Sequence, residues 1–353
     1  MPARPSGIPF TDLPAAAAEV WAKIQPRYMQ ALLSAQYVGG PAVASFERQW
    51  AAYCGARYAI GVANGTDALE LALTGLGIGH GDEVIVPAST FVATAAAVAR
   101  VGAVPRFADV DADTLLITPQ TLRAAATERT RAVIVVHLYG QMPDMTRLLA
   151  TAESLGILLI EDAAQAHGAE WQGRRAGSFG IAACFSFYPS KNLGAFGDAG
   201  AVVTSDSGLA EKIREFANHG RPGRAHFDHR YIGRNSRLDT LQAIVLEGGL
   251  RMVTSAKAAR HVFHLLVVRV PRRDDVRRLL MQRNIQTSIH YPTPCHLQPP
   301  FQRFASGRLP VSELAACEVL SLPLFPHMTR RQVDDVCDNL LDTVRSLMAE
   351  GRA

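Results

Sequence analysis

Short apolar segments alternate with amphipathic helical patterns over residues 58–220. The apolar segments predict strands at residues 58–63, 82–87, 104–110, 131–140, 156–162, 183–188 and 200–205. The intervening patterns predict helices at residues 67–79, 91–102, 145–156 and 208–220. Strands that alternate with helices of this length favour an α/β fold with a mostly parallel central sheet and helices on both faces. In such sheets ligands bind beyond the carboxyl ends of the strands.

The pattern changes after about residue 246. A strand is predicted at residues 261–270 and helices at residues 273–284 and 329–349, with a proline-rich loop, HYPTPCHLQPP, at residues 290–300. We therefore predict a large domain at residues 1–246, which includes an N-terminal helical segment, and a smaller C-terminal α+β domain at residues 247–353.

The composition is that of a soluble globular protein, with 48% hydrophobic and 19% charged residues. No apolar run is long enough to cross a bilayer, and the N-terminal stretch lacks the apolar core of a signal peptide. Five scattered cysteines without a CxxC pair argue against a disulfide framework or a zinc site. The net charge of +4 comes from basic residues interspersed with acids, which is not a nucleic-acid-binding pattern. We expect a cytoplasmic protein with no metal and with neither membrane nor nucleic acid as a partner.

Lysine is rare in this chain, and one of its four lysines lies in an unusual place. Lys191 is in the segment FSFYPSKNLGAFGDAG, among aromatic residues, small residues and glycines. A lysine is almost never buried unless it is paired or used chemically, and desolvation makes its amine a nucleophile that can form a Schiff base. Lys23, Lys212 and Lys257 lie in helical or polar segments, where a solvated lysine is ordinary. Lys191 is therefore the candidate catalytic amine.

Two other segments place polar groups where a strand ends or a helix begins. In VANGTDAL, Gly65 permits close backbone approach and Thr66 adds a hydroxyl at a helix N-terminus, where phosphate binds. A simple helix cap at Thr66 or Asp67 is the alternative. In LLIEDAAQAHGA an apolar strand runs into Asp162, a candidate buried carboxylate that would need a cationic partner. The alternative is that Asp162 caps the segment 163–168.

Taken together, these groups match the needs of pyridoxal 5′-phosphate. Its aldehyde needs an amine, its pyridine nitrogen needs a carboxylate that holds the nitrogen's proton, and its phosphate needs N–H and hydroxyl donors. Phe91, which opens a predicted helix, could cover the ring face, with core packing as its alternative. A nucleotide-binding Rossmann protein is not supported, because no GxGxxG follows the first strand.

Longer motifs extend this interpretation to nearly the whole chain. They are ANGTDALELAL, GDEVIVPASTFVATAAAV, VHLYGQMPDM, EDAAQAHGA, FSFYPSKNLGAFGDAGAVVT, GRNSRLDTLQA and HYPTPCHLQP, in this order. With them the chain resembles the DegT/DnrJ-type sugar aminotransferases, which are pyridoxal-phosphate enzymes of the aspartate-aminotransferase fold, fold type I. The resemblance thus implies a large domain built on a mostly parallel sheet, and a smaller C-terminal domain.

The resemblance also implies roles for individual residues. It implies that Lys191 is the Schiff-base lysine, that Asp162 pairs with the pyridine nitrogen and that Gln165 hydrogen-bonds the ring hydroxyl. The remaining implied cofactor contacts are Gly65, Thr66 and Ser186 for the phosphate, Phe91 for the ring face, and Asn235 for the phosphate bound in a neighbouring subunit. Because family members are dimers with shared active sites, we expect a homodimer.

The expected reaction follows from the same resemblance. An amino-acid donor, L-glutamate, would give its amino group to a nucleotide-linked keto sugar. His290 and His296 lie in a loop similar to the family's sugar-nucleotide contact region, although surface histidines are the alternative. Arg230, Arg234 or Arg237 could hold the diphosphate. Relatives that remove oxygen from sugars carry histidine in place of the lysine, so Lys191 favours transamination.

Two other functions remain open. One is transfer to a keto-cyclitol of an aminoglycoside pathway, with glutamine as the donor. The other is a non-catalytic, pyridoxal-phosphate-binding regulatory protein, which is less favoured because the chain carries no appended DNA-binding pattern. The arginine-rich, lysine-poor composition is compatible with a bacterial pathway for an antibiotic or a surface polysaccharide.

The chain departs from the family at one place. Between residues 241–246 and 261–266 the family usually runs a long helix and the start of the small domain, but here only EGGLRMVTSAKAAR intervenes. A few dozen residues of the usual inter-domain segment are therefore absent. Either residues are missing from this junction or the chain is a naturally short variant; we favour the first, because that helix usually links the two domains.

Overall fold

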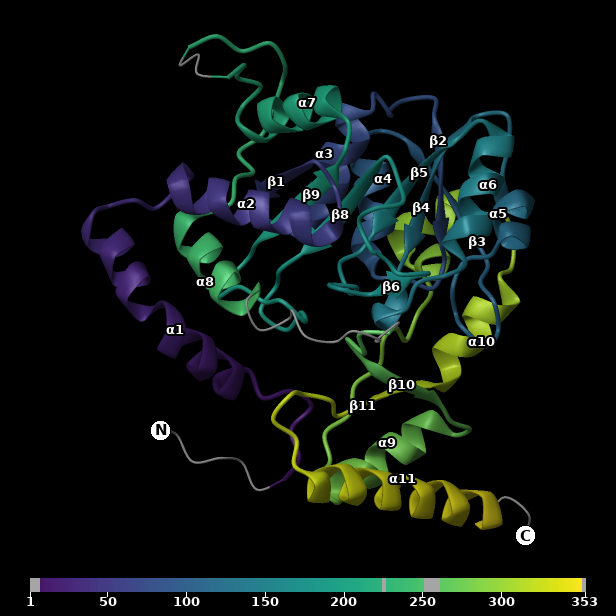
Figure 1. Ribbon diagram of the computed structural model, residues 1–353. Helices are drawn as coiled ribbons and strands as arrows, with labels where there is room; N and C mark the ends of the chain where they lie inside the picture. The colour runs from purple at the N-terminus through teal and green to yellow at the C-terminus, as the bar shows by residue number, and fades with distance from the viewer. Residues whose placement is uncertain (1–6, 224–226, 251–260, 351–353) are drawn as a thin grey trace.

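The structure, a computed structural model, describes residues 7–223, 227–250 and 261–350 (Figure 1). Its largest element is a seven-stranded sheet. In spatial order its strands are β1 (Tyr58–Val62), β9 (Gly200–Thr204), β8 (Ala182–Ser186), β5 (Leu158–Asp162), β4 (Thr130–Val136), β2 (Glu83–Pro87) and β3 (Val104–Ala108). Neighbouring strands from β8 to β3 are parallel, whereas β9 is antiparallel to both of its neighbours. The predicted α/β fold with a mostly parallel sheet is confirmed.

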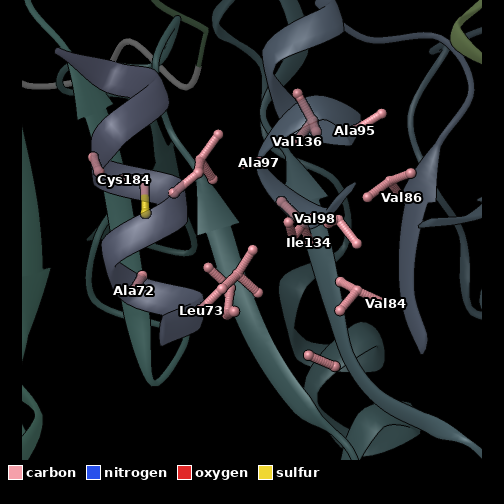
Figure 2. Close-up of a cluster of buried hydrophobic side chains, with 14 of the residues drawn as sticks. Ala72, Leu73, Val84, Val86, Ala95, Ala97, Val98, Ile134, Val136 and Cys184 are labelled. Atoms are coloured by element: carbon pink, nitrogen blue, oxygen red, sulfur yellow. The ribbon is translucent and has the colours of Figure 1, made fainter. Parts of the chain in front are cut away.

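Helices cover both faces of this sheet, and each face has its own apolar core. The first core includes α3 (Gly65–Gly75), α4 (Val92–Arg100) and α7 (Ser207–Ala217), and the second includes α2 (Gly40–Cys54), α5 (Pro119–Ala125), α6 (Met145–Leu155) and α8 (Thr240–Leu250). In β4, Ile134 belongs to the first core and Val133 to the second, because successive strand residues point to opposite faces. Figure 2 shows part of the first core, where Leu73 of α3 points toward the sheet.

The start of α3 differs from the predicted helix at residues 67–79. The side chain of Asn64 accepts a hydrogen bond of 2.8 Å from the backbone N–H of Asp67 and caps the helix. The cap is therefore neither Thr66 nor Asp67, contrary to the alternative interpretation of this segment. The helix begins two residues earlier than predicted, and its first backbone N–H groups belong to Gly65 and Thr66.

The C-terminal part of the chain forms a smaller α+β unit. Its strands β10 (Leu266–Arg269) and β11 (Val319–Leu322) pair antiparallel, and its helices are α9 (Arg273–Gln282), α10 (Pro310–Glu318) and α11 (Arg330–Glu350). The strand predicted at residues 261–270 is thus shorter than expected. Short elements complete the structure: η1 (Leu138–Gly140), η2 (Cys295–Leu297), η3 (Pro299–Phe304), β6 (Glu170–Trp171) and β7 (Arg174–Arg175).

The N-terminal segment connects the two parts. Ile8 forms a β-bridge with Ile285 and lies in the apolar cluster of the C-terminal unit. The chain then continues into α1 (Leu13–Leu33), which packs against α8 on the large body (Figure 1). The predicted boundary at residue 246 falls inside α8, and the division into two domains stays a prediction. Residues 251–260, which hold most of the short junction and Lys257, lie outside the described residues.

From the sequence we expect no membrane-spanning segment, no metal site and no disulfide framework. No helix among the described residues is both long and apolar enough to cross a membrane. The same residues contain no group of three or more histidine, cysteine or acidic side chains that could hold a metal ion. All five cysteines are free thiols.

A substitution in the first core tests the described packing. Leu73 is fully buried in it, so Leu73→Ala should lower the free energy of unfolding by about 3 to 5 kcal/mol. Leu341, on α11, is 50% exposed, and Leu341→Ala should cost less than about 1 kcal/mol. Urea denaturation followed by circular dichroism measures both changes. Equal losses in the two variants would contradict the described packing.

Candidate active site

A cavity of about 660 Å³ lies at the carboxyl ends of the central strands. Asp162 ends β5 and Ser186 ends β8, and both line this cavity. Eight of the residues predicted for the site line it: Gly65, Thr66, Phe91, Asp162, Gln165, Ser186, Lys191 and His290. The fold therefore brings together side chains that are up to 225 positions apart in the sequence.

Lys191 and Asp162 face the same space. Lys191 lies in a turn after β8, and its backbone N–H donates to the carbonyl of Tyr188 at 2.8 Å. Burial lowers the pKa of its amine, and the carboxylate of Asp162 opposes this shift. No ion pair within 4 Å joins the two side chains among the described residues. Both side chains line the cavity.

Asp162 is buried and needs support as an anion. Burial raises the pKa of its carboxyl, and hydrogen bonds from Thr94 and the backbone of Ala164 oppose that rise, as does the charge of Lys191. The hydroxyl of Thr94 donates to Oδ2 at 2.8 Å, and the N–H of Ala164 donates to Oδ1 at 3.2 Å. Residues 163–168 form turns and not a helix, so Asp162 caps no helix there, although it accepts the N–H of Ala164 within this segment.

The phosphate contacts implied by the sequence meet where α3 begins. A Cβ atom placed on Gly65 would lie 2.6 Å from the Cβ of Ser186, so only glycine allows these two elements to approach this closely. Backbone N–H groups at the start of an α-helix attract anions. The ring of His167, which is fully buried, contacts the carbonyl of Ser186 at 2.9 Å and supports this end of β8.

The middle of the cavity is lined by Gln165 and two aromatic rings. The side-chain oxygen of Gln165 accepts from the N–H of Tyr139 at 2.7 Å, and its amide nitrogen donates to the hydroxyl of Tyr291 at 3.0 Å. Phe91 is 51% exposed, so it is not packed in the core as its alternative role required. Its ring centroid lies 5.7 Å from that of Tyr291. A flat ligand ring could lie against the exposed face of Phe91.

Three predicted residues do not line this cavity. The guanidinium of Arg234 bonds the carboxylates of Glu70 and Asp67, and Asn235 is exposed on a neighbouring loop. His296 is buried, with its Nε2 3.5 Å from the Glu313 carboxylate. The alternative of a surface histidine is therefore wrong, because the loop that follows His290 folds His296 inward, whereas its role as a substrate contact stays a prediction.

Two further arginines are engaged within the chain. Arg230 pairs with Glu215 at 3.3 Å, and Arg237 bonds the side-chain oxygen of Asn218 at 3.2 Å. The basic residue found at the cavity besides Lys191 is Arg100, whose Nε lies 2.5 Å from the Glu70 carboxylate.

Sequence reasoning missed three residues at this site. Thr94 supports Asp162, Tyr291 joins the C-terminal unit to Gln165, and His264 lines the cavity from the segment before β10. The signal for Thr94 was its spacing of one helical turn from Thr90 within VPASTFVATAAAV. Tyr291 lies within the motif HYPTPCHLQP and His264 within the strand predicted at residues 261–270, but neither segment gives a local sign of these contacts.

These residues fit pyridoxal phosphate. Four groups that the cofactor needs lie around one cavity. They are the partly desolvated amine of Lys191, the buried carboxylate of Asp162, the helix N-terminus at Gly65 and the exposed ring of Phe91. Any side chain at position 65 would fill the space between the start of α3 and Ser186. The fold and the donor set together define the class of fold type I pyridoxal-phosphate enzymes.

Comparisons with known proteins agree with this class. The model of the DegT/DnrJ/EryC1/StrS aminotransferase family matches residues 20–255 and 246–341. A dTDP-3-amino-3,4,6-trideoxy-alpha-D-glucose transaminase of Streptomyces venezuelae is 43% identical, over 94% of this chain and 94% of the relative. The solved structure of DesV from S. venezuelae, in complex with a ketimine intermediate, has a TM-score of 0.89 and covers 95% of this chain and 97% of its own. The chain belongs to the DegT/DnrJ/EryC1/StrS aminotransferase family.

Other relatives extend the comparison to cofactor and substrates. The structure of NtdA from Bacillus subtilis, 29% identical with a TM-score of 0.87, contains the cofactor PMP and covers 98% of this chain and 86% of its own. A UDP-2-acetamido-2-deoxy-3-oxo-D-glucuronate aminotransferase of Pseudomonas aeruginosa is 40% identical over 94% of this chain and 98% of the relative. A relative from Geobacillus stearothermophilus, 40% identical over 96% of this chain and 99% of its own, is named a pleiotropic regulatory protein. The protein is a pyridoxal-phosphate-dependent aminotransferase.

Proposed function

We propose that the protein transfers an amino group from L-glutamate to carbon 3 of a nucleotide-linked 3-keto sugar. The observation that carries the proposal is the shared cavity of Lys191 and Asp162. The position of the keto group is supported by the names of five relatives, which are 38–43% identical and name an amino, oxo or dehydro group at carbon 3 of a dTDP- or UDP-linked sugar.

Each site residue has a defined task in this reaction. Pyridoxal phosphate, when bound, supplies an aldehyde and an electron-withdrawing ring. Lys191 would hold the cofactor through its amine, and the same amine would serve as the proton carrier. Burial helps because it favours the neutral amine. Asp162 would hold the proton of the pyridine nitrogen, while Gly65, Thr66 and Ser186 would hold the phosphate.

Regulatory activity without turnover is the second candidate, because two relatives carry regulatory or sensory names. Burial of the Lys191 amine favours its neutral form, which a Schiff base needs in either case, so burial does not separate the two candidates. Turnover with a keto sugar therefore separates the two candidates.

The role of Lys191 can be tested against a matched lysine. Lys191→Ala should remove the visible absorption band of the bound cofactor and reduce turnover by about a thousandfold. Lys212, which is exposed on α7, provides the control, and Lys212→Ala should behave like the unchanged protein. Absorption spectra and a coupled assay for 2-oxoglutarate provide the two measurements. Full turnover by the Lys191 variant would refute the proposed role.

The acceptor can be tested with paired substrates. We expect kcat/KM for a dTDP- or UDP-linked 3-keto sugar to exceed that for its 4-keto isomer by at least about tenfold, because a pocket built to bind the surrounding hydroxyls rejects a displaced keto group. A keto-inositol with glutamine as donor serves as the third substrate. Preference for the 4-keto sugar would overturn the carbon-3 assignment, and preference for the keto-inositol would favour the cyclitol pathway.

We also propose a homodimer in which Asn235 of one subunit reaches the phosphate bound in the other. In support, Asn235 is exposed and lies outside its own cavity. The same loop carries Ile232, which is 101% exposed, and Phe227, which is 93% exposed. Large apolar side chains this exposed are typical of surfaces that a partner covers.

Mixing two inactive variants tests the shared site. Lys191→Ala and Asn235→Ala homodimers should each be impaired, but their heterodimer holds one site with both native residues. After subunit exchange at equal concentrations, about a quarter of the native activity should return, because half of the dimers are mixed and each has one intact site. No recovery, although exchange is demonstrated by mass spectrometry, would show that Asn235 does not act across the interface.

A further inference from the structure

Asp162 is held by a chain of two threonine hydroxyls that comes from a different element. Thr94 lies in the first turn of α4, 68 positions before Asp162, and is completely buried. Its Oγ1 is 2.8 Å from Oδ2 of Asp162 and 2.9 Å from Oγ1 of Thr90, which is also buried. The other carboxylate oxygen, Oδ1, accepts from the backbone of Ala164.

The direction of these hydrogen bonds follows from the chemistry of the groups. An ionised carboxylate can only accept, so the single hydroxyl hydrogen of Thr94 points at Asp162. The oxygen of Thr94 is then an acceptor, and Thr90 donates to it. Both hydroxyl dipoles therefore present their positive ends toward Asp162. Hydrogen bonds arranged in this head-to-tail order polarise one another, and the terminal bond to the carboxylate is strengthened.

The backbone at Thr90 is fixed from the C-terminal unit. The thiol of Cys295 donates to the carbonyl of Thr90 at 3.4 Å, and the N–H of Cys295 donates to the carbonyl of Ala88 at 2.9 Å. The backbone at the start of the hydroxyl chain is therefore held in place by two hydrogen bonds from Cys295.

The carboxylate has few other stabilising groups. Lys191 across the cavity and His137 behind β5 are the cationic or titratable groups that favour its ionised form. The ring of His137 is already engaged by the carboxylate of Glu161 at 2.8 Å. Thr94 is thus the side chain that is bonded directly to Asp162 among the described residues.

We propose that Thr94, backed by Thr90, is a positioning residue that keeps Asp162 ionised and directed at the pyridine nitrogen of the cofactor. This inference rests on the proposed role of Asp162. Thr94 itself touches the carboxylate and not the reacting atoms. It acts by making a buried anion available as an acceptor for the nitrogen's proton.

The test compares pyridoxal phosphate with its 1-deaza analogue, in which carbon replaces the ring nitrogen. Only the first can use Asp162, so the ratio of the two dissociation constants reports that contact apart from folding and turnover. For the native protein we expect tighter binding of pyridoxal phosphate. Thr94→Val, which keeps the shape and removes the hydroxyl, should reduce this preference about tenfold, the loss expected for a hydrogen bond to a charged group. Fluorescence titration of the apoprotein measures the constants.

Four further variants sharpen the result. Thr94→Ser restores the hydroxyl and should restore the preference, whereas Thr90→Val should reduce it by a smaller factor. Thr343 is buried with no hydrogen-bond partner for its hydroxyl among the described residues. Thr343→Val therefore controls for a buried threonine-to-valine substitution as such, and it should leave the preference for pyridoxal phosphate unchanged. Adding Thr94→Val to Asp162→Asn should have no further effect on the preference.

The outcomes separate this inference from the function on which it rests. If Thr94→Val weakens both cofactors equally, or neither, Thr94 has no part in the nitrogen contact and the inference is overturned. If the native protein itself does not distinguish the two cofactors, the assigned role of Asp162 fails first and the inference falls with it. Loss of preference in Thr94→Val with rescue by Thr94→Ser supports both.

Discussion

The close approach of α3 to the end of β8 is the constraint on which the rest of the site depends. A Cβ atom at position 65 would clash with the Cβ of Ser186. A Cβ atom at position 200, in β9, would clash in the same way with the backbone of Asn64. These contacts are possible because β9 runs antiparallel between β1 and β8, so that the carboxyl end of β8 and the start of β9 lie under the helix N-terminus. An anion-binding helix end is thereby fixed beside the turn that carries Lys191.

Keeping charged groups inside this fold costs free energy. Asp162 is buried and Lys191 is half-buried, and burial shifts each toward its neutral form. For a lysine that serves as a nucleophile the shift is useful, but for a carboxylate that must hold a proton on a ring nitrogen it is not. The two groups differ in their support: hydroxyl and backbone donors bond the Asp162 carboxylate, whereas the charge of Asp162 is what opposes the effect of burial on the Lys191 amine.

The sequence predicted the sheet, the covering helices and most of the cavity, because alternating periodicity and long motifs are local signals. It could not predict where Arg234 and His296 point. Both stand in convincing motifs, yet each is engaged by a carboxylate from another element, Glu70 on α3 for Arg234 and Glu313 on α10 for His296. The partnership of Thr94 with Asp162 is of the same kind, since nothing within either segment records the other. The N-terminal bridge at Ile8 was likewise invisible to local periodicity.

That bridge adds a second attachment to the contacts between the two parts of the molecule. The C-terminal unit already contacts the sheet body directly, because Cys295 bonds the backbone of Thr90 and Tyr291 bonds Gln165. Through Ile8, the segment that leads into α1 joins the same unit from the other end of the chain. The ring of Tyr291 at the cavity is therefore held by a unit that both ends of the polypeptide help to build.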